Sequence, residues 1–232
     1  MEKNYLEKVS QNKRGQDFII GDIHGHFDEL MLELQKIEFD VSCDRLFSVG
    51  DLIDRGNQHR LVTELVDETW FFPVRGNHDQ FIIDQYDEER VLRYQYEGYS
   101  PEEIHLALEG EWFAALAEDD RRWFYRKLVE LPYLIELETT HGSVGICHAG
   151  VPPDINDWNA LKSQLDDRNT RELVLRTRQA PKLNRTIKNI ALTVHGHTCF
   201  ESPKKVGNSL FIDTYDKTGK LTLLNIADLI EK

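Results

Sequence analysis

Five short apolar segments of this chain each end in a glycine-flanked cluster of Asp, Asn or His residues. The clusters span residues 21–25 (GDIHG), 50–56 (GDLIDRG), 75–79 (RGNHD), 148–150 (HAG) and 195–198 (HGHT). In open α/β sheets, ligands bind at the carboxyl ends of the strands. Glycine at such a point lets the backbone turn sharply and come close to a ligand. The pattern therefore predicts strands that deliver polar side chains to one shared site.

The first half of the chain alternates short apolar runs with helical patterns. Strands are predicted at residues 17–20, 45–49 and 70–74, and helices at 27–38 and 56–67, from the spacing of their apolar residues. A regular alternation of strand and helix is typical of an α/β fold, in which helices connect strands that run in the same direction. This half is therefore expected to form a parallel sheet.

The second half is predicted to be helical at first and then rich in strands. Residues 84–131 are expected to be mostly helical, and residues 158–176 to form a helix. Further strands are predicted at residues 133–137, 143–147, 190–194, 210–212 and 221–226. Because the last three strands have short connections, part of the sheet is expected to be antiparallel. We predict an α/β fold of one domain over residues 1–232, with two packed mixed β-sheets flanked by helices.

Composition restricts the class of protein and its partners. The 232 residues are 40% hydrophobic and carry a net charge of −13, which fits a compact domain and argues against binding to nucleic acid or a membrane surface. No run approaches the ~18 apolar residues of a membrane-spanning helix, and the first five residues, MEKNY, contain no apolar signal region. Three scattered cysteines indicate a reduced, cytoplasmic protein. The sequence leaves the oligomeric state open.

The side chains in the clusters are of the types that bind metal ions. Carboxylate and amide oxygens together with imidazole nitrogens suit Mn²⁺, Fe or Zn²⁺. One metal takes roughly three or four protein ligands, and more candidates than that converge here. Two metals about 3.5–4 Å apart that share a carboxylate would use them all. Each cluster alone also fits a turn, a helix N-cap or a core histidine, but five clusters after successive strands favour a metal site.

The clusters resemble the signatures of a known family. The first three resemble the signature blocks of the phosphoprotein phosphatases, which belong to the calcineurin-like metallophosphoesterases, and the last two resemble its later histidine blocks. The chain length, the early first block, Trp112-Phe113 and residues 212–214 (IDT) are most similar to the small bacterial and lambda-type phage protein phosphatases. The resemblance extends from about residue 17 to residue 226, and it implies the calcineurin-like fold with a dinuclear metal site at the strand ends.

The resemblance also implies a set of metal ligands. The first metal would be bound by Asp22, His24 and Asp51, and the second by Asp51, Asn77, His148 and His197. Asp51 would then bridge the two ions. Mn²⁺ is the expected metal, with iron or zinc as alternatives, because all of these ligands are oxygen or nitrogen donors.

Further residues would bind phosphate and move protons. The resemblance implies that His78 is the general acid, that Asp54 pairs with it, and that Arg55 and Asn77 contact the phosphate. Two divalent metals make a bridging water acidic enough to yield hydroxide near neutral pH. That hydroxide would attack phosphorus in line, while His78 protonates the leaving oxygen. No Cys-x5-Arg motif is present, so direct attack by water is favoured over a covalent phosphoenzyme.

The chain departs from the family pattern at several positions. A second phosphate-binding arginine follows a Trp-x-Arg pattern in the family; its nearest match is Arg178, with Arg176 at the Trp position. Tyr215 replaces a family glycine, and Cys199 stands where related enzymes have a ligand histidine; a core or loop role is favoured for this cysteine over a redox-sensitive one. The remaining histidines match no ligand and are expected to be structural or on the surface: His26, His59, His105, His141 and His195.

These residues predict a metal-dependent hydrolase of phosphomonoesters. A serine/threonine protein phosphatase, with dual specificity as a variant, is favoured by the sequence Asp54-Arg55-Gly56, and its substrate would be a phosphorylated protein or a small phosphoester. The alternatives are a dinucleoside polyphosphate hydrolase, a small phosphodiesterase, or a catalytically silent metal-binding module. An aromatic group in the helical stretch could form a substrate rim or belong to the core: Tyr94, Tyr96, Tyr99, Trp112 and Phe113.

Overall fold

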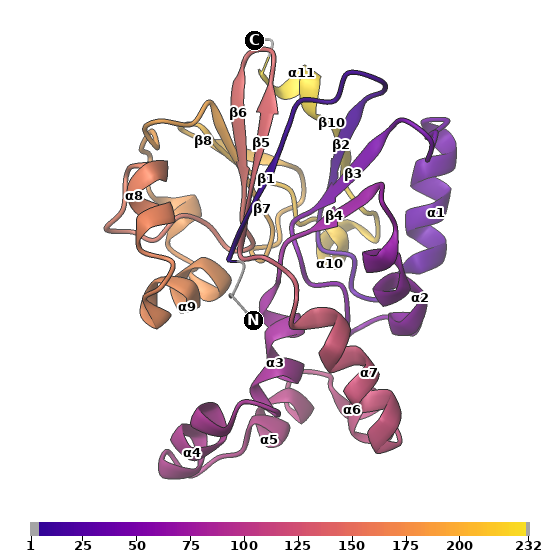
Figure 1. The fold of residues 1–232 in the computed structure, drawn as a ribbon, viewed down its shortest axis with the longest axis vertical. Coiled ribbons are helices and arrows are strands. Elements are labelled where there is room, and N and C mark those ends of the chain that lie inside the picture. The colour runs from indigo at the N-terminus through magenta and orange to yellow at the C-terminus, as the bar shows by residue number, and fades with distance from the viewer. Residues whose placement is uncertain (1–4, 231–232) are drawn as a thin grey trace.

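The computed structural model describes residues 5–230. The prediction that the first five residues contain no apolar signal region concerns residues that lie almost entirely outside this range. Two β-sheets form the centre of the molecule (Figure 1). The six-stranded sheet has the order β1 (Leu6–Val9), β5 (Leu134–Thr139), β6 (Gly142–Ile146), β7 (Leu192–His195), β9 (Ser209–Phe211) and β8 (Lys204–Val206). The four-stranded sheet has the order β10 (Leu223–Asn225), β2 (Asp17–Ile20), β3 (Arg45–Ser48) and β4 (Phe71–Pro73). The predicted α/β fold with two mixed sheets is confirmed.

Helices flank both sheets and extend beyond one end of them (Figure 1). Beside the four-stranded sheet lie α1 (Phe27–Lys36) and α2 (His59–Glu64), the latter continued by a short 3₁₀ turn, and beside the six-stranded sheet lie α8 (Trp158–Ser163) and α9 (Arg168–Arg176). A group of five helices gathers at the lower end in Figure 1: α3 (Asn77–Asp84), α4 (Glu88–Tyr96), α5 (Pro101–Leu106), α6 (Glu111–Ala114) and α7 (Glu118–Leu128). Two short helices follow late in the chain, α10 (Tyr215–Thr218) and α11 (Ile226–Ile230).

The direction of the strands brings their carboxyl ends to one edge. β2, β3 and β4 are parallel neighbours, and β6 and β7 are parallel neighbours in the other sheet. Apolar residues of both sheets meet in one buried cluster, which includes Ile19 and Phe47 of the four-stranded sheet and Ile146 and Val194 of the six-stranded sheet. Because this core packs the sheets against each other, the residues that follow these five strands are held close together.

The prediction that part of the sheet is antiparallel is confirmed, although the late strands do not pair in chain order. β9 lies parallel to β7. The reason is the unpredicted strand β8, which forms a tight hairpin with β9 around Gly207 and so reverses the chain before β9 pairs with β7. β8 has the sequence KKV, and its two lysines are exposed at the sheet edge, so its apolar pattern is too weak to read. β10 is antiparallel to β2 in the other sheet.

The predicted helix over residues 158–176 is divided in two. α8 ends at Ser163 and α9 begins at Arg168. The side chain of Asp167 accepts a hydrogen bond from the Thr170 backbone N–H at 2.9 Å, which caps the first turn of α9. The predicted helix is therefore interrupted, because Asp167 caps the start of a second helix.

Two expectations about compartment can be compared with the structure. Between residues 5 and 230, no helix combines the length and the apolar character needed to cross a membrane. Cys43, Cys147 and Cys199 are free thiols.

Candidate metal centre and active site

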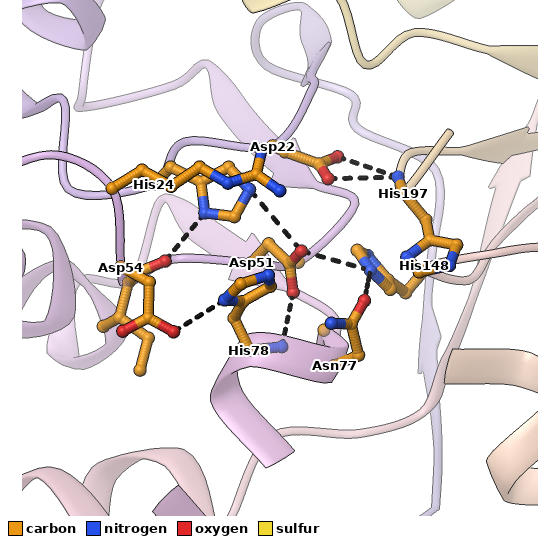
Figure 2. A network of polar contacts seen from close by, with 12 residues as sticks. Asp22, His24, Asp51, Asp54, Asn77, His78, His148 and His197 are labelled. Carbon is orange, nitrogen blue, oxygen red and sulfur yellow. Dashed lines mark hydrogen bonds and ion pairs between the residues drawn. The ribbon is translucent and has the colours of Figure 1, made fainter. Parts of the chain in front are cut away.

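The structure brings the six predicted metal ligands together around one point (Figure 2). Two of them follow β2, one follows β3, one opens α3 after β4, and the last two follow β6 and β7. In that order they are Asp22, His24, Asp51, Asn77, His148 and His197. All of them are buried except His197, which is half-buried. Residues up to 175 positions apart in the sequence therefore form one compact polar cluster.

Asp51 lies at the centre of this cluster. Its Oδ2 is 3.6 Å from His24 Nε2 on one side and 3.4 Å from His148 Nε2 on the other. Its Oδ1 accepts a hydrogen bond from the backbone N–H of His78 at 2.9 Å. Asp51 belongs to two groups of three residues. Within each group, the potential ligand atoms all lie within 4.8 Å of one another. The carboxylate is thus placed where a bridge between two cations would be.

Backbone carbonyl groups fix the ring orientation of the two histidines that face Asp51. Nδ1 of His24 lies 2.8 Å from the carbonyl oxygen of Ile53, and Nδ1 of His148 lies 2.8 Å from that of Val49. A carbonyl oxygen only accepts, so each Nδ1 carries the hydrogen. Each Nε2 then faces the carboxylate and, in the neutral ring, presents a lone pair to it, as metal-binding histidines do when a backbone carbonyl orients them.

Several potential ligand atoms converge at this point. His148 Nε2 lies 2.9 Å from Asn77 Oδ1, in addition to its approach to Asp51. His24 Nε2 and His197 Nε2 are buried and have no hydrogen-bond partner. Burial lowers the pKa of both His24 and His197 to about 3, so these rings are neutral at pH 7. Buried imidazole nitrogens with unpaired lone pairs, close to carboxylates, form a set of ligands that a divalent cation satisfies, so the residues present fit metal ions.

The pKa shifts of Asp22 and His148 reflect the carboxylates gathered at this site. Burial, and next the neighbouring carboxylate of Asp213, raise the pKa of Asp22 well above its usual value. The buried imidazole of His148 would have a lowered pKa from burial alone, but the Asp51 carboxylate raises it to about 9. His148 is therefore protonated at neutral pH, and its positive charge lies beside the carboxylates, where a cation is favoured.

The backbone around the ligands adopts a conformation that side chains other than glycine rarely take. Five residues of the site have positive φ angles: His24 (47°), Asp51 (51°), Asp54 (69°), Arg55 (64°) and His197 (65°). Such angles cost free energy and occur where a sharp turn is required. Gly76 and Gly196 add close approach, since a Cβ atom would overlap Asp51 at the first and Asp22 at the second. These turns aim successive side chains into the cluster.

Asp79 was not assigned a role from the sequence, although it lies in one of the clusters. Its carboxylate accepts hydrogen bonds from the backbone N–H groups of Gly76, Asp51 and Leu52 at 2.8, 3.1 and 3.0 Å. It therefore ties the loop after β3 to the loop after β4. The position three residues after a helix N-cap is the only sequence signal for this role.

His78 and Asp54 form a buried pair beside the cluster. His78 Nδ1 lies 2.6 Å from Asp54 Oδ2, and the ring of His78 packs edge-on against His24 with a centroid separation of 4.9 Å. Burial alone would lower the pKa of His78, but the nearby Asp51 carboxylate and the Asp54 hydrogen bond outweigh it, and the pKa is raised. The pair can therefore hold a proton next to the metal ligands. His78 also lies within ligand distance of His24 and Asp51.

Three arginines approach the site, with different partners. Arg55 Nη1 forms an ion pair of 2.5 Å with Asp216 of α10 at the rim. Arg178 is exposed, and its Nη1 lies 3.5 Å from the carbonyl oxygen of His197. Arg176 instead pairs with Glu172 at 3.0 Å and lies over the ring of Phe81. Arg178 has no carboxylate partner between residues 5 and 230 and is placed to meet an anion, Arg55 would exchange Asp216 for one, and Arg176 is held by its neighbours.

The five histidines predicted to be structural or exposed include buried and exposed residues; His59 is buried and stacks on Trp112. His195 is fully buried, with Nδ1 2.9 Å from the Cys147 carbonyl and Nε2 2.9 Å from Thr193 Oγ1, which is a structural role. His26 stacks on Tyr215, and His141 is exposed. His105 is buried, as a structural residue would be, and its Nε2 lies 3.0 Å from Asp54 Oδ1.

The aromatic group and Cys199 also separate by position. Phe113 belongs to the core, whereas Trp112 is half-buried and donates to Asp54 from Nε1 at 2.7 Å. Tyr96 and Tyr99 are exposed on α4 and just after it. Burial, together with nearby Asp213, raises the pKa of the Cys199 thiol to about 11, so it is protonated at neutral pH.

Comparison with known proteins agrees with this geometry. The family model described as calcineurin-like phosphoesterase matches residues 18–210. Serine/threonine-protein phosphatase 1 of Salmonella typhimurium is 33% identical over 61% of this chain and 62% of its own length, and serine/threonine-protein phosphatase 2 of Escherichia coli is 26% identical over 97% and 100%. A symmetrical bis(5'-nucleosyl)-tetraphosphatase of Coxiella burnetii is 33% identical over 70% of this chain but only half of its own length.

Solved structures share the fold at lower identity. A serine/threonine phosphatase from Saccharomyces cerevisiae superimposes with a TM-score of 0.63 at 15% identity, over 91% of this chain and 71% of that one. Identity at this level speaks for the fold alone. The family match and the phosphatase-named relatives together support a metal-dependent phosphatase. With its fold and its converging ligands, the chain belongs to the calcineurin-like phosphoesterase family.

Proposed function

We propose that this protein is a serine/threonine protein phosphatase that hydrolyses phosphomonoesters with two divalent cations. Mn²⁺ is the cation we favour, with iron or zinc as alternatives, because the converging ligands are carboxylate, amide and imidazole groups. Dual specificity toward phosphotyrosine is compatible with the same chemistry. The free thiols make the cytoplasm the compartment we propose for it.

The residues of the site divide the work of hydrolysis among them. Asp22, His24, Asp51, His148 and His197, together with Asn77, would hold the cations, which when bound activate water and neutralise phosphate charge. The guanidinium groups of Arg55 and Arg178, and the amide of Asn77, would bind the phosphate oxygens. His78 would donate a proton to the leaving oxygen, and Asp54 would keep its ring oriented.

The observation that carries this proposal is the buried His78–Asp54 pair beside an intact set of metal ligands. A silent metal-binding module would have no need of a proton donor with a fixed orientation. The pair lies next to Asp51, so a phosphate held at the ligands would present its leaving oxygen to the imidazole. This arrangement favours an enzyme over a binding module.

A dinucleoside polyphosphate hydrolase is the second candidate, since the Coxiella relative bears such a name. Two observations weigh against it. The alignment with the Escherichia coli phosphatase spans both chains almost completely, while the tetraphosphatase has another half that this chain does not match. In addition, Arg176 is paired with Glu172 and Arg55 with Asp216, which leaves little unpaired positive charge at the site for a chain of four phosphates.

A substrate panel tests the proposed function. With Mn²⁺ present, we expect a higher kcat/KM on phosphoserine and phosphothreonine peptides than on diadenosine tetraphosphate, because the site offers two arginines to one phosphate. Release of inorganic phosphate measures the peptides, and chromatography of the nucleotides measures the dinucleotide. A higher kcat/KM on the dinucleotide would make the second candidate the correct one.

Removal of metal is expected to abolish the activity. Dialysis against a chelator should leave a folded but inactive protein, and Mn²⁺ should restore hydrolysis of p-nitrophenyl phosphate, because the lone pairs of His24 and His197 have no other partner. Circular dichroism and metal analysis accompany the assay. Full activity in a preparation shown to be free of metal contradicts the dinuclear mechanism.

The two arginines after α9 are expected to respond differently to mutation. Arg178→Ala should lower kcat/KM on a phosphopeptide roughly tenfold, because a charge-assisted hydrogen bond to phosphate is lost. Arg176→Ala is the matched control; it should lower the midpoint of thermal unfolding instead, since it breaks the contacts with Glu172 and Phe81. The reverse pattern of effects would assign phosphate binding to Arg176.

A further inference from the structure

The carboxylate of Asp54 has more hydrogen-bond donors than its pairing with His78 requires. Its Oδ1 accepts a hydrogen bond from Trp112 Nε1 at 2.7 Å, and His105 Nε2 lies 3.0 Å from Oδ1 and 3.1 Å from Oδ2. Asp54 is completely buried, so these contacts take the place of water. Ring N–H groups from α3, α5 and α6 thus hold both oxygens of one carboxylate.

The second partner of His105 shows which of its nitrogens carries the hydrogen. Gln85 Nε2, an amide donor, lies 3.1 Å from His105 Nδ1, so this nitrogen accepts. His105 Nε2 then carries the hydrogen and donates it to Asp54. The ring also packs between Phe81 and Phe113, with centroid separations of 5.9 and 5.6 Å. Hydrogen bonding and packing therefore fix this imidazole in one orientation.

The helical segment over residues 101–114 is shaped to bring these two donors to Asp54. Ser100 and Glu103 form a capping box that starts α5, and Gly110 lies so close to the His105 ring that a Cβ atom would overlap it. His105 and Trp112 are 51 and 58 residues from Asp54 in the sequence. The contact therefore joins the helical end of the molecule to the proton-transfer pair.

We propose that His105 and Trp112 are positioning residues for proton transfer, which act by holding Asp54 in the orientation that fixes the His78 imidazole. This inference rests on the proposed general-acid role of His78. With one donor removed, the carboxylate shifts toward the donors that remain, and the His78 ring loses its fixed direction toward the leaving oxygen. The loss should therefore grow with the dependence of the leaving group on a proton.

The test compares variants of the Mn²⁺-loaded enzyme on phenyl phosphate, whose leaving group needs a proton, and on p-nitrophenyl phosphate, whose leaving group is acidic. His105→Phe keeps the ring packing and removes the donor; we expect kcat on phenyl phosphate to fall roughly 10- to 100-fold, the range seen for outer-shell partners, with a much smaller loss on p-nitrophenyl phosphate. Trp112→Phe should show the same pattern. His105→Gln, which restores an N–H near the Nε2 position, should recover most of the activity.

Two controls separate positioning from a structural role. His59→Phe changes the ring that stacks on Trp112 at 3.9 Å but removes no bond from Asp54, and it should leave the ratio between the substrates unchanged. In the metal-free protein, the His78 Nδ1 proton is expected as a downfield NMR resonance that persists in His59→Phe and shifts or broadens in His105→Phe. If His105→Phe does not fold, Trp112→Phe carries the same test from a half-buried position.

The outcomes distinguish this inference from the function on which it rests. Equal losses on both substrates in His105→Phe and Trp112→Phe, while His78→Asn discriminates between them, overturn the positioning role and leave the general acid in place. Equal losses in His78→Asn overturn the general-acid assignment, and the positioning role with it. A loss of metal in His105→Phe would also overturn the inference, since it would show a general disturbance of the site.

Discussion

Asp51→Asn should abolish phosphatase activity and also remove most of the bound metal. The carboxylate faces His24 on one side and His148 on the other, at 3.6 and 3.4 Å, so it is the one ligand placed to serve two cations. A neutral amide bridges two cations poorly, because it supplies one oxygen and no charge. Turnover of p-nitrophenyl phosphate and metal content by mass spectrometry measure the two effects on the same sample.

The control for this variant is Asp67→Asn, which makes the same chemical change at an exposed residue paired with Lys127. It should retain both activity and metal. Retention of two metal ions per chain in Asp51→Asn would show that other residues hold the cations and that the central position of this carboxylate has another purpose.

His78→Asn should leave the metals in place and slow turnover by about 10²–10⁴-fold, the usual contribution of a general acid. The reason is that His78 bonds to Asp54 through Nδ1, so Nε2 is the nitrogen that would donate to the leaving oxygen. The loss should shrink along a series of aryl phosphates as the leaving group becomes more acidic. Asp54→Asn should give a weaker version of the same dependence, because it no longer supports the protonated imidazole.

His141→Asn serves as the comparison, since this histidine is exposed in the turn between β5 and β6. It should behave as the unaltered protein. His78 also lies within ligand distance of His24 and Asp51, so metal analysis is essential. Loss of metal as complete as in Asp51→Asn would identify His78 as a ligand rather than an acid.

The sequence was most informative where strands end in polar clusters. The parallel strands β2, β3 and β4 were predicted from strand and helix alternation, and parallel strands present their carboxyl ends at one edge. This geometric rule places Asp22, Asp51 and Asn77 together without any knowledge of the distances. Local signals therefore predicted both the fold class and the group of residues that the structure brings together.

The sequence was least informative where contacts join remote segments. His105 lies on a short helix, and nothing within several residues of it resembles a cluster of site residues. Its contact with Asp54 depends on how α5 and α6 fold back across the loop after β3, which is decided by packing of Phe81 and Phe113 rather than by local pattern. The strand β8 escaped prediction for a related reason, since its pairing with β9 outweighs a weak apolar pattern.

The left-handed backbone at five residues of the site costs stability, and this cost indicates which of their side chains are retained for function. Each such residue costs on the order of 1–3 kcal/mol, whereas a whole domain is stable by only about 5–15 kcal/mol. Glycine would fit the backbone at Arg55 with less strain. At Asp54 the strain is offset, because the buried carboxylate accepts hydrogen bonds from three rings whose N–H groups glycine would leave unpaired. The charged side chain at Arg55 is therefore best explained by selection for chemistry, and Arg55→Gly is expected to relieve backbone strain while it weakens activity.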